Sequence, residues 1–309
     1  MGATGRGGYN EFVRMMNAII SHQNDQSILD KLSAQRNLYN KAKTLRGVRF
    51  GLGVFLIVCL SVSRLIWADC EIVDTALIIA TAVALIAEPL LESTINKRRV
   101  LAAQIQQRLD NELYGFEWDD CVCGREPSDE LICDLKDSPV DENLKNWYDV
   151  GIGSIVDEHV AILLCQRENI SYDSGLRSWY VTLCAWVASI LAILVIALSF
   201  VEGWDIMKIL VFGVLPAIPI AEWFTVIFQD NASDKEHLLA LEDLVKSETE
   251  KTILGGTVSK TTLQKIQNLL FLHRKSGYLI PSWFYRWKRK RSEQRAAYSV
   301  SEFLKKYKT

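Results

Sequence analysis

Charged residues are nearly absent from two long segments of this 309-residue chain, residues 50–91 and 178–228. They crowd instead between these two segments and beyond residue 229. A helix needs about 20 apolar residues to cross the ~30 Å hydrocarbon core of a bilayer, so each segment is long enough for two crossings. This segregation is typical of an integral membrane protein and not of a soluble globular domain.

The apolar segments predict an all-α membrane protein with four transmembrane helices, arranged as two tandem hairpins joined to a helical cytosolic layer. The expected spans are Phe50–Ala68, Ile72–Leu91, Ser178–Phe200 and Ile206–Phe228. The third span contains no charged residue and is the clearest of the four. The second is the weakest, because a glutamate and a proline interrupt it.

The distribution of lysine and arginine around the spans predicts the orientation of the chain. The hairpin loops around residues 68–74 and 201–205 are acidic, whereas cations concentrate at the opposite ends of the spans. These flanking cations are Lys41, Lys43, Arg46, Arg49, Lys97, Arg98, Arg99, Arg167 and Arg177. By the positive-inside rule, both termini and the middle segment of this multi-pass protein lie in the cytoplasm.

Five segments follow from these spans. They are an N-terminal cytosolic helix (1–47), a first transmembrane hairpin (48–91), a cytosolic helical insert (92–177), a second hairpin (178–228) and C-terminal cytosolic helices with a basic aromatic tail (229–309). Helical periodicity is expected over residues 96–114 and 144–168 of the insert. In the last segment, Thr257 or Ser259 is expected to cap a helix, and the basic run to lead into a short final helix.

The polar stretches that precede the two hairpins resemble each other. Gln35-Arg36 is followed ten residues later by Leu45-Arg46, and Gln166-Arg167 is followed at the same distance by Leu176-Arg177. This pattern indicates a parallel repeat of helix, span, span and helix, related by an axis along the membrane normal. Chance similarity between two polar helices is the alternative interpretation.

Two carboxylates lie inside the expected spans, beside prolines that can bend the helices. Glu88 is followed by Pro89, and Glu222 follows Pro216 and Pro219. A charged side chain inside a span costs up to ~3 kcal/mol at its centre and must face protein or water. In an oligomer the two glutamates could form acidic rings at the mouth of a pore. Alternatively, both lie close enough to the interface to be solvated or paired with flanking cations.

A polar cluster lies directly before the third span. It contains Gln166, Arg167, Glu168, Asn169, Tyr172, Asp173 and Arg177. Arginine and tyrosine suit contacts to phosphate and to nucleobases. The same residues would serve equally as a hydrogen-bonded collar that ties helix to helix, and the similar Gln35-Arg36 pair favours the collar.

The remaining motifs indicate fewer specific functions. The basic tail, residues 286–295, is interleaved with tryptophan and tyrosine and most simply binds anionic lipid headgroups, with nucleotide binding as the alternative.

Cys121, Cys123 and Cys133 lack the spacing and the fourth ligand of a zinc site, so no metal or other cofactor is expected. The four histidines are far apart in the sequence and indicate no catalytic constellation, so we expect no enzyme. A net charge of -2 indicates no DNA or RNA polymer as partner.

Several motifs together resemble those of the SMODS-associated four-transmembrane effector family. They are Gln35-Arg36 with Tyr39 and Lys43, Glu117-Trp118-Asp119, Trp147-Tyr148, Cys165–Asn169 with Tyr172-Asp173 and Arg177, and Pro281 with Trp283 and Tyr285. The resemblance extends from about His22 to Lys305, and its most specific part is the run that begins at Cys165.

The resemblance implies a bacterial inner-membrane effector of cyclic-oligonucleotide-based anti-phage signalling (CBASS). Such an effector is expected to bind a cyclic oligonucleotide second messenger as its activating ligand, and to breach the membrane. The residues implied as ligand contacts are the cluster before the third span, together with Gln35, Arg36, Trp147 and Tyr148.

The leading hypothesis from the sequence is therefore a cyclic-oligonucleotide-gated effector that forms a homo-oligomer in the lipid bilayer and causes abortive infection. A nucleotide-independent ion channel or transporter that uses Glu88 and Glu222 is a second hypothesis. A structural membrane scaffold that docks a partner protein is a third.

Overall fold

The structure, a computed structural model, describes residues 18–67, 70–139, 141–148, 152 and 157–307. In these residues the regular structure is helical, without a β-strand, which confirms the all-α prediction. Residues 1–17 of the N-terminal segment and the expected end of the first span at Ala68 lie outside the described residues.

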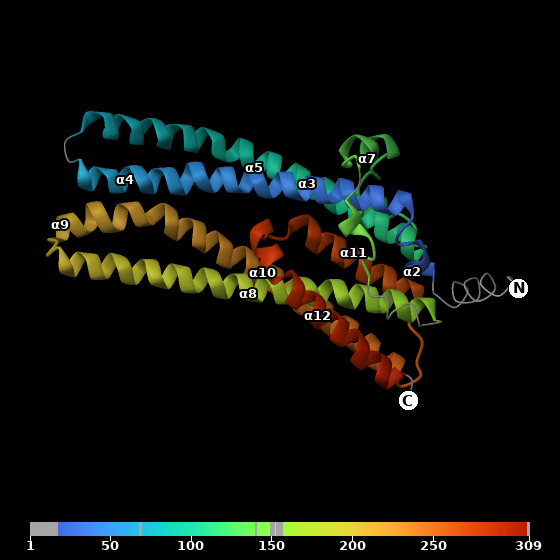
Figure 1. Cartoon of the computed structure of the whole chain (residues 1–309). Helices are drawn as coiled ribbons and strands as arrows, with labels where there is room; N and C mark the ends of the chain where they lie inside the picture. The colour runs from blue at the N-terminus through green and yellow to red at the C-terminus, as the bar shows by residue number, and fades with distance from the viewer. Residues whose placement is uncertain (1–17, 68–69, 140, 149–151, 153–156, 308–309) are drawn as a thin grey trace, which may run out of the picture.

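The first hairpin consists of two long antiparallel helical rods (Figure 1). Helix α3 (Gln26–Phe50) continues through a π-helical stretch, η1 (Gly51–Phe55), into α4 (Leu56–Ile66). The junction residues keep right-handed helical dihedrals, so the chain enters the apolar segment without a break. Helix α5 (Glu71–Tyr114) returns along this rod and leaves the apolar segment as one helix that contains Pro89.

The second hairpin has the same layout. Helix α8 (Glu158–Val201) leads outward, and the return rod is formed by α9 (Ile206–Lys208), the π-helical stretch η4 (Ile209–Val214) and α10 (Leu215–Ile253). The Asp205 side chain caps the start of this return rod by accepting from the Lys208 N–H. The shared layout agrees with a repeat, but the parallel repeat itself stays a prediction.

The apolar halves of the four rods lie side by side in a row (Figure 1). Helix α4 packs against α5 and α10, and α10 packs against α8. Most apolar side chains of this part face outward, as Ile78 (71% exposed) and Phe200 (83% exposed) illustrate. Among the described residues, three helices are long and apolar enough to cross a membrane: Gln26–Ser63, Glu71–Tyr114 and Glu158–Val201. Outward apolar surface of this kind is stable only in lipid.

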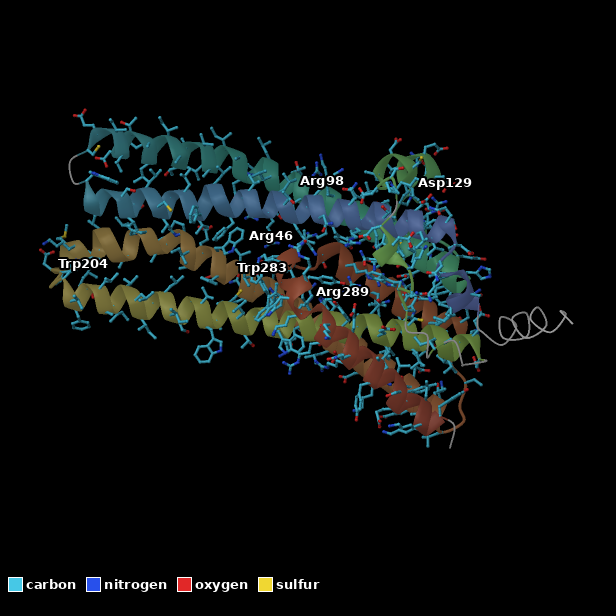
Figure 2. All side chains as sticks on the ribbon, in the orientation of Figure 1. Arg46, Arg98, Asp129, Trp204, Trp283 and Arg289 are labelled. Atoms are coloured by element: carbon cyan, nitrogen blue, oxygen red, sulfur yellow. The ribbon has the colours of Figure 1, made fainter. Side chains whose placement is uncertain are left out.

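Charged side chains gather at the other end of the molecule, in what we call the polar layer (Figure 2). It is built from the polar halves of α3, α5, α8 and α10, and two further helices pack on them, α11 (Lys260–Ser276) and α12 (Ser282–Tyr307). Short helices complete the layer: α2 (Ala18–His22), α6 (Asp120–Cys123), α7 (Asp129–Leu135) and the 3₁₀ turn η2 (Glu142–Leu144). Its core contains fully buried apolar side chains such as Leu32, Leu163 and Ile266.

Two boundaries in the polar layer differ from the prediction. The helix expected over residues 144–168 begins only at Glu158, where the Asp157 side chain accepts hydrogen bonds from the first free N–H groups. Residues 145–148 are irregular, and Asn146 has a left-handed φ of 56°, which a helix excludes. Residues 149–151 and 153–156 lie outside the described residues.

The last helix is also longer than predicted. The basic run and the expected short final helix form one element, α12, because no helix breaker occurs between Ser282 and Tyr307. The predicted cap of α11 is confirmed at Ser259, whose hydroxyl accepts from the Thr262 N–H.

Candidate functional site

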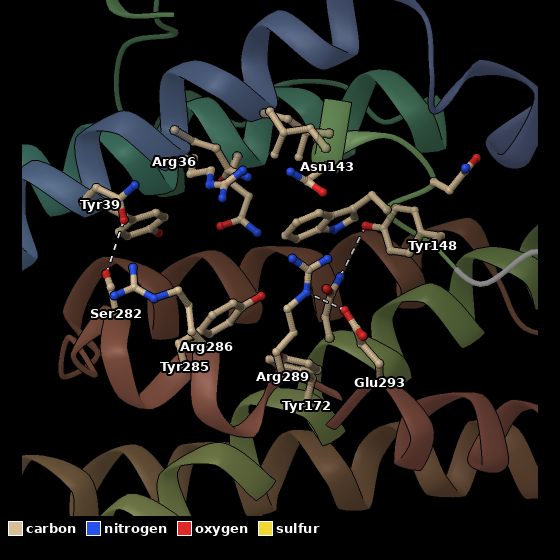
Figure 3. Close-up of a pocket in the computed structure, with 18 of the residues that line it drawn as sticks. Arg36, Tyr39, Asn143, Tyr148, Tyr172, Ser282, Tyr285, Arg286, Arg289 and Glu293 are labelled. Carbon is tan, nitrogen blue, oxygen red and sulfur yellow. Dashed lines mark hydrogen bonds and ion pairs between the residues drawn. The ribbon is translucent and has the colours of Figure 1, made fainter. Parts of the chain in front are cut away.

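A cavity of about 390 Å³ opens in the polar layer, between α3, α8, α12 and residues 141–148, which comprise η2 and the irregular segment after it (Figure 3). Helix α3 contributes Gln35, Arg36, Tyr39, Asn40 and Lys43 to its wall. These positions recur at intervals of three and four residues, so they share one face of the helix. The wall from α8 consists of Glu168, Asn169 and Tyr172.

Helix α12 closes the cavity with a second polar face. This face carries Ser282, Tyr285, Arg286, Arg289 and Glu293, again at helical spacing. Figure 3 shows Arg286 and Arg289 rising from α12 toward the side chains of α3 and segment 141–148.

The rotation of α12 is fixed where the helix begins. The Pro281 carbonyl accepts hydrogen bonds from the N–H groups of Phe284 and Tyr285. The Phe284 ring is fully buried and packs edge-on against Tyr180 of α8, with ring centroids 5.2 Å apart. Because Phe284 is anchored inside, Arg286, Arg289 and Glu293 face away from it and line the cavity.

The irregular segment supplies aromatic surface. The Tyr148 hydroxyl is buried, donates to Asp110 at 3.1 Å and lies 2.6 Å from the Tyr114 hydroxyl. The Tyr148 backbone N–H donates to the Gln23 side chain at 2.9 Å, so the backbone of Tyr148 is held in place as well as its hydroxyl. Trp147, the preceding residue, is 38% exposed and lines the cavity.

Positive charge exceeds negative charge in the cavity wall. Arg36 is paired with Asp141 at 2.8 Å and Arg289 with Glu293 at 2.6 Å, and Arg286 makes no ion pair among the described residues. Burial lowers the pKa of Lys43 to about 8, and its ammonium group lies 5.6 Å from the centre of the Tyr285 ring. This wall is suited to a ligand with more than one negative charge.

The Gln35 Oε1 atom is buried in the wall and lacks a hydrogen-bond partner within the described part of the chain. Buried polar atoms are nearly always satisfied in native proteins, so orphans in a cavity wall indicate a missing polar ligand or water. Burial also raises the pKa of Tyr172, so its hydroxyl keeps its proton and can donate.

The cavity brings together seven of the eleven residues that the sequence analysis named as ligand contacts: Gln35, Arg36, Trp147, Tyr148, Glu168, Asn169 and Tyr172. The remaining four, Gln166, Arg167, Asp173 and Arg177, lie outside its wall. The cluster before the third span is therefore divided between the cavity and the packing around it.

Three of these four residues form contacts between helices. The Gln166 amide donates to the Leu263 carbonyl at 2.9 Å, inside the core between α8 and α11. The Asp173 carboxylate accepts from Arg177 Nε at 2.8 Å and lies 2.6 Å from His273 Nε2. Burial alone would raise the pKa of Asp173, but the two neighbours hold it well below its usual value. These contacts match the collar interpretation.

Arg167 is half-buried on α8, away from the cavity, and this burial lowers the pKa of its guanidinium. Its predicted contact to ligand therefore has no support from its position.

Several wall residues were absent from the predicted contacts. Tyr39, Asn40 and Lys43 follow Gln35 and Arg36 on the same helical face, so helical spacing could have identified them. Arg286 and Arg289 belong to the tail that was interpreted as lipid-binding. No local signal in the sequence indicates that α12 folds back over α3 and α8.

Of the residues expected at a pore, Glu88 and Glu222 lie toward the polar-layer end of their spans, whereas Pro216 and Pro219 lie midway along the fourth span. Arg49 binds Glu88 and also Glu92, the latter at 2.6 Å, so Glu88 is paired with a flanking cation. Glu222 is exposed on α10. Pro216 and Pro219 occupy the first turns of α10, directly after η4, and Pro89 lies within α5. A role for these residues in a pore stays a prediction.

Comparison with known proteins agrees with this architecture. The family model of the SMODS-associating 4TM effector domain matches residues 17–303. A protein of Bacillus cereus (strain VD146), described as a probable CBASS effector molecule, is 27% identical over 305 residues, which cover 93% of this chain and 98% of that relative. No solved structure matches the chain. The match over nearly the whole length shows that the chain belongs to the SMODS-associating four-transmembrane effector family.

Proposed function

We propose that this chain is a membrane effector of bacterial anti-phage defence that a cyclic oligonucleotide activates by binding in the cavity of the polar layer. Once activated, it oligomerises and opens or disrupts the inner membrane, which ends the infection with the death of the cell. Family membership supports the effector role. The observation that supports a bound ligand is the cavity itself, which combines cations, aromatic rings and the unpartnered Gln35 Oε1 atom.

The side chains of the cavity wall suit both the phosphates and the nucleobases of a cyclic oligonucleotide. Guanidinium groups bind phosphate through paired charge-assisted hydrogen bonds, and Arg286 and Arg289 present two of them from one helical face. Nucleobases stack on aromatic rings, which Trp147, Tyr285 and Tyr39 provide on different sides of the cavity. A volume of about 390 Å³ is within the usual range for small-molecule sites.

The walls of the cavity continue into the membrane as unbroken helices. Helix α3 leads through η1 into α4, and α8 runs from the cavity wall to the tip of the second hairpin. A ligand that draws α3, α8 and α12 together would therefore shift the two hairpins relative to each other. It activates the protein only if it binds the active arrangement more tightly than the resting one.

Dye leakage tests this proposal. Liposomes that contain the purified full-length protein should release an entrapped dye when cyclic oligonucleotides are added, and linear oligonucleotides of the same composition should have no effect. Absence of leakage with every cyclic di- and trinucleotide tested would contradict the proposal. Steady leakage without nucleotide, abolished in the E88Q/E222Q variant, would instead favour a nucleotide-independent channel.

Ligand affinity should also depend on pH through Lys43. An anionic ligand prefers the charged ammonium, so affinity is complete below a pKa of about 8 and falls, by at most tenfold per pH unit, as pH rises above it. Nucleotide phosphates stay ionised and burial holds the pKa of Tyr39 at about 12, so neither group titrates in this window.

Calorimetric titration at pH 7 and pH 9 with the detergent-solubilised protein measures this effect. The K43R variant keeps its charge across the range and should lose most of the pH dependence. An equal fall in affinity for K43R and the unmodified chain would exclude Lys43 as the titrating group.

A further inference from the structure

Helix α12 has a second basic face that does not line the cavity. The Lys288 ammonium lies 5.0 Å from the ring centre of Trp179, and the Arg291 guanidinium lies 4.9 Å from the same ring. Trp179 belongs to α8, one residue into the expected third span. These two cations therefore lie at the level where α8 enters the membrane.

Packing at the start of α12 also places this face of the helix at the level where the spans enter the membrane. Phe284 belongs to one buried cluster with Cys184 of α8 and Ile227 of α10, and both of these residues lie within the expected spans. Trp283 and Trp287 flank Phe284 on the outer side of the helix and are 53% and 62% exposed. Tryptophan at this depth is typical of the interface between hydrocarbon and headgroups.

The charge of this face is uncompensated. Residues 286–295 contain six cations and a single carboxylate, Glu293, and this carboxylate binds Arg289 on the cavity side. Within the described residues, Lys288, Lys290 and Arg291 make no ion pair. Unpaired cations beside exposed tryptophans at a membrane surface attract anionic groups.

We propose that Trp283, Trp287, Lys288, Lys290 and Arg291 form a lipid face that binds the headgroups of anionic phospholipids on the polar-layer side of the bilayer. The tryptophan rings lie among the upper acyl chains and glycerol groups, and the cations bind the phosphates. The two faces of α12 thus take different anions, the lipid on this face and the ligand in the cavity. The lipid face does not depend on the identity of that ligand.

Lipid titration of the full-length protein in detergent tests the lipid face, with native mass spectrometry as the readout. Phosphatidylglycerol should bind more tightly than phosphatidylcholine with the same acyl chains. Because a cation near a membrane surface contributes roughly a fivefold change in affinity, K288Q/R291Q should weaken phosphatidylglycerol binding by about 30-fold. The matched control R125Q/K246Q removes two exposed cations from other elements and should bind as the unmodified chain does.

Three results would overturn the proposal. Equal binding of the two lipids would show that the face has no preference for anionic headgroups. Loss of phosphatidylglycerol binding in R286Q/R289Q, with K288Q/R291Q unaffected, would move the lipid site into the cavity. Full displacement of phosphatidylglycerol by inorganic phosphate at millimolar concentration would show that the site takes a free anion and not a lipid.

Discussion

The R286Q/R289Q variant should bind its cyclic oligonucleotide about 100- to 10,000-fold more weakly than the unmodified protein and should lose nucleotide-triggered dye leakage. Both side chains project from α12 into the cavity, and their positions lie three residues apart on one face of the helix. A hydrogen bond to a charged group contributes about 1.5–3 kcal/mol, so the loss of two such contacts gives this range. Calorimetry on the solubilised protein and leakage from liposomes provide the two measurements.

The R125Q/K246Q variant is the matched control, because it also removes two positive charges but from exposed positions on other elements. It should retain affinity to within a few-fold. The R286K/R289K variant keeps the charge and loses the planar fork, so its affinity should fall between the two. If R286Q/R289Q binds nucleotide as well as the control does, the cavity is not the ligand site.

The hairpins could be predicted because their signal is local in the sequence. The near absence of charge over residues 50–91 and 178–228 can be seen within each segment by itself. In lipid such a segment forms a helix, because a helix satisfies all backbone hydrogen bonds within the segment. Local sequence does not predict that α3 continues into α4, or that α8 runs unbroken from the polar layer into the membrane. The polar halves of these rods have the composition of ordinary soluble helices, so the sequence indicates a boundary at Phe50 where the backbone has none.

The cluster before the third span shows what helical spacing can and cannot decide. Gln166, Asp173 and Arg177 follow each other at separations of seven and four residues and share one face of α8, whereas Glu168 and Tyr172 share the opposite face. This division follows from the sequence alone. Which face meets a cavity depends on the packing of α11 and α12, segments that lie about 100 residues further along the chain, and no local pattern encodes that packing.

The second large effect should come from Arg177, which lies where the two hairpins meet. Its guanidinium binds the buried Asp234 of α10 and donates to the Tyr278 carbonyl at 3.3 Å. The same Asp234 carboxylate accepts from the Tyr278 N–H at 2.7 Å. From the first hairpin, the Arg46 guanidinium lies 3.6 Å from the centre of the Tyr278 ring. Residues from α3, α8 and α10 are thus tied to the short segment that leads into α12.

The R177M variant should lower the free energy of unfolding by about 3–5 kcal/mol, because it leaves the Asp234 carboxylate buried without its cation. Denaturant unfolding of the full-length protein in detergent measures the change. The control is R36Q, which removes an arginine from an exposed ion pair with Asp141 and should cost no more than about 1 kcal/mol.

A second substitution separates the buried charge from the other lost contacts. In R177M/D234L both members of the Arg177–Asp234 pair are apolar, so the double variant should be more stable than R177M. If the double variant is as unstable as R177M, the cost comes from the lost contacts of Arg177 with Asp173 and the Tyr278 carbonyl, and not from the unpaired Asp234 carboxylate. If R177M unfolds like R36Q, the junction between the hairpins does not depend on Arg177 at all.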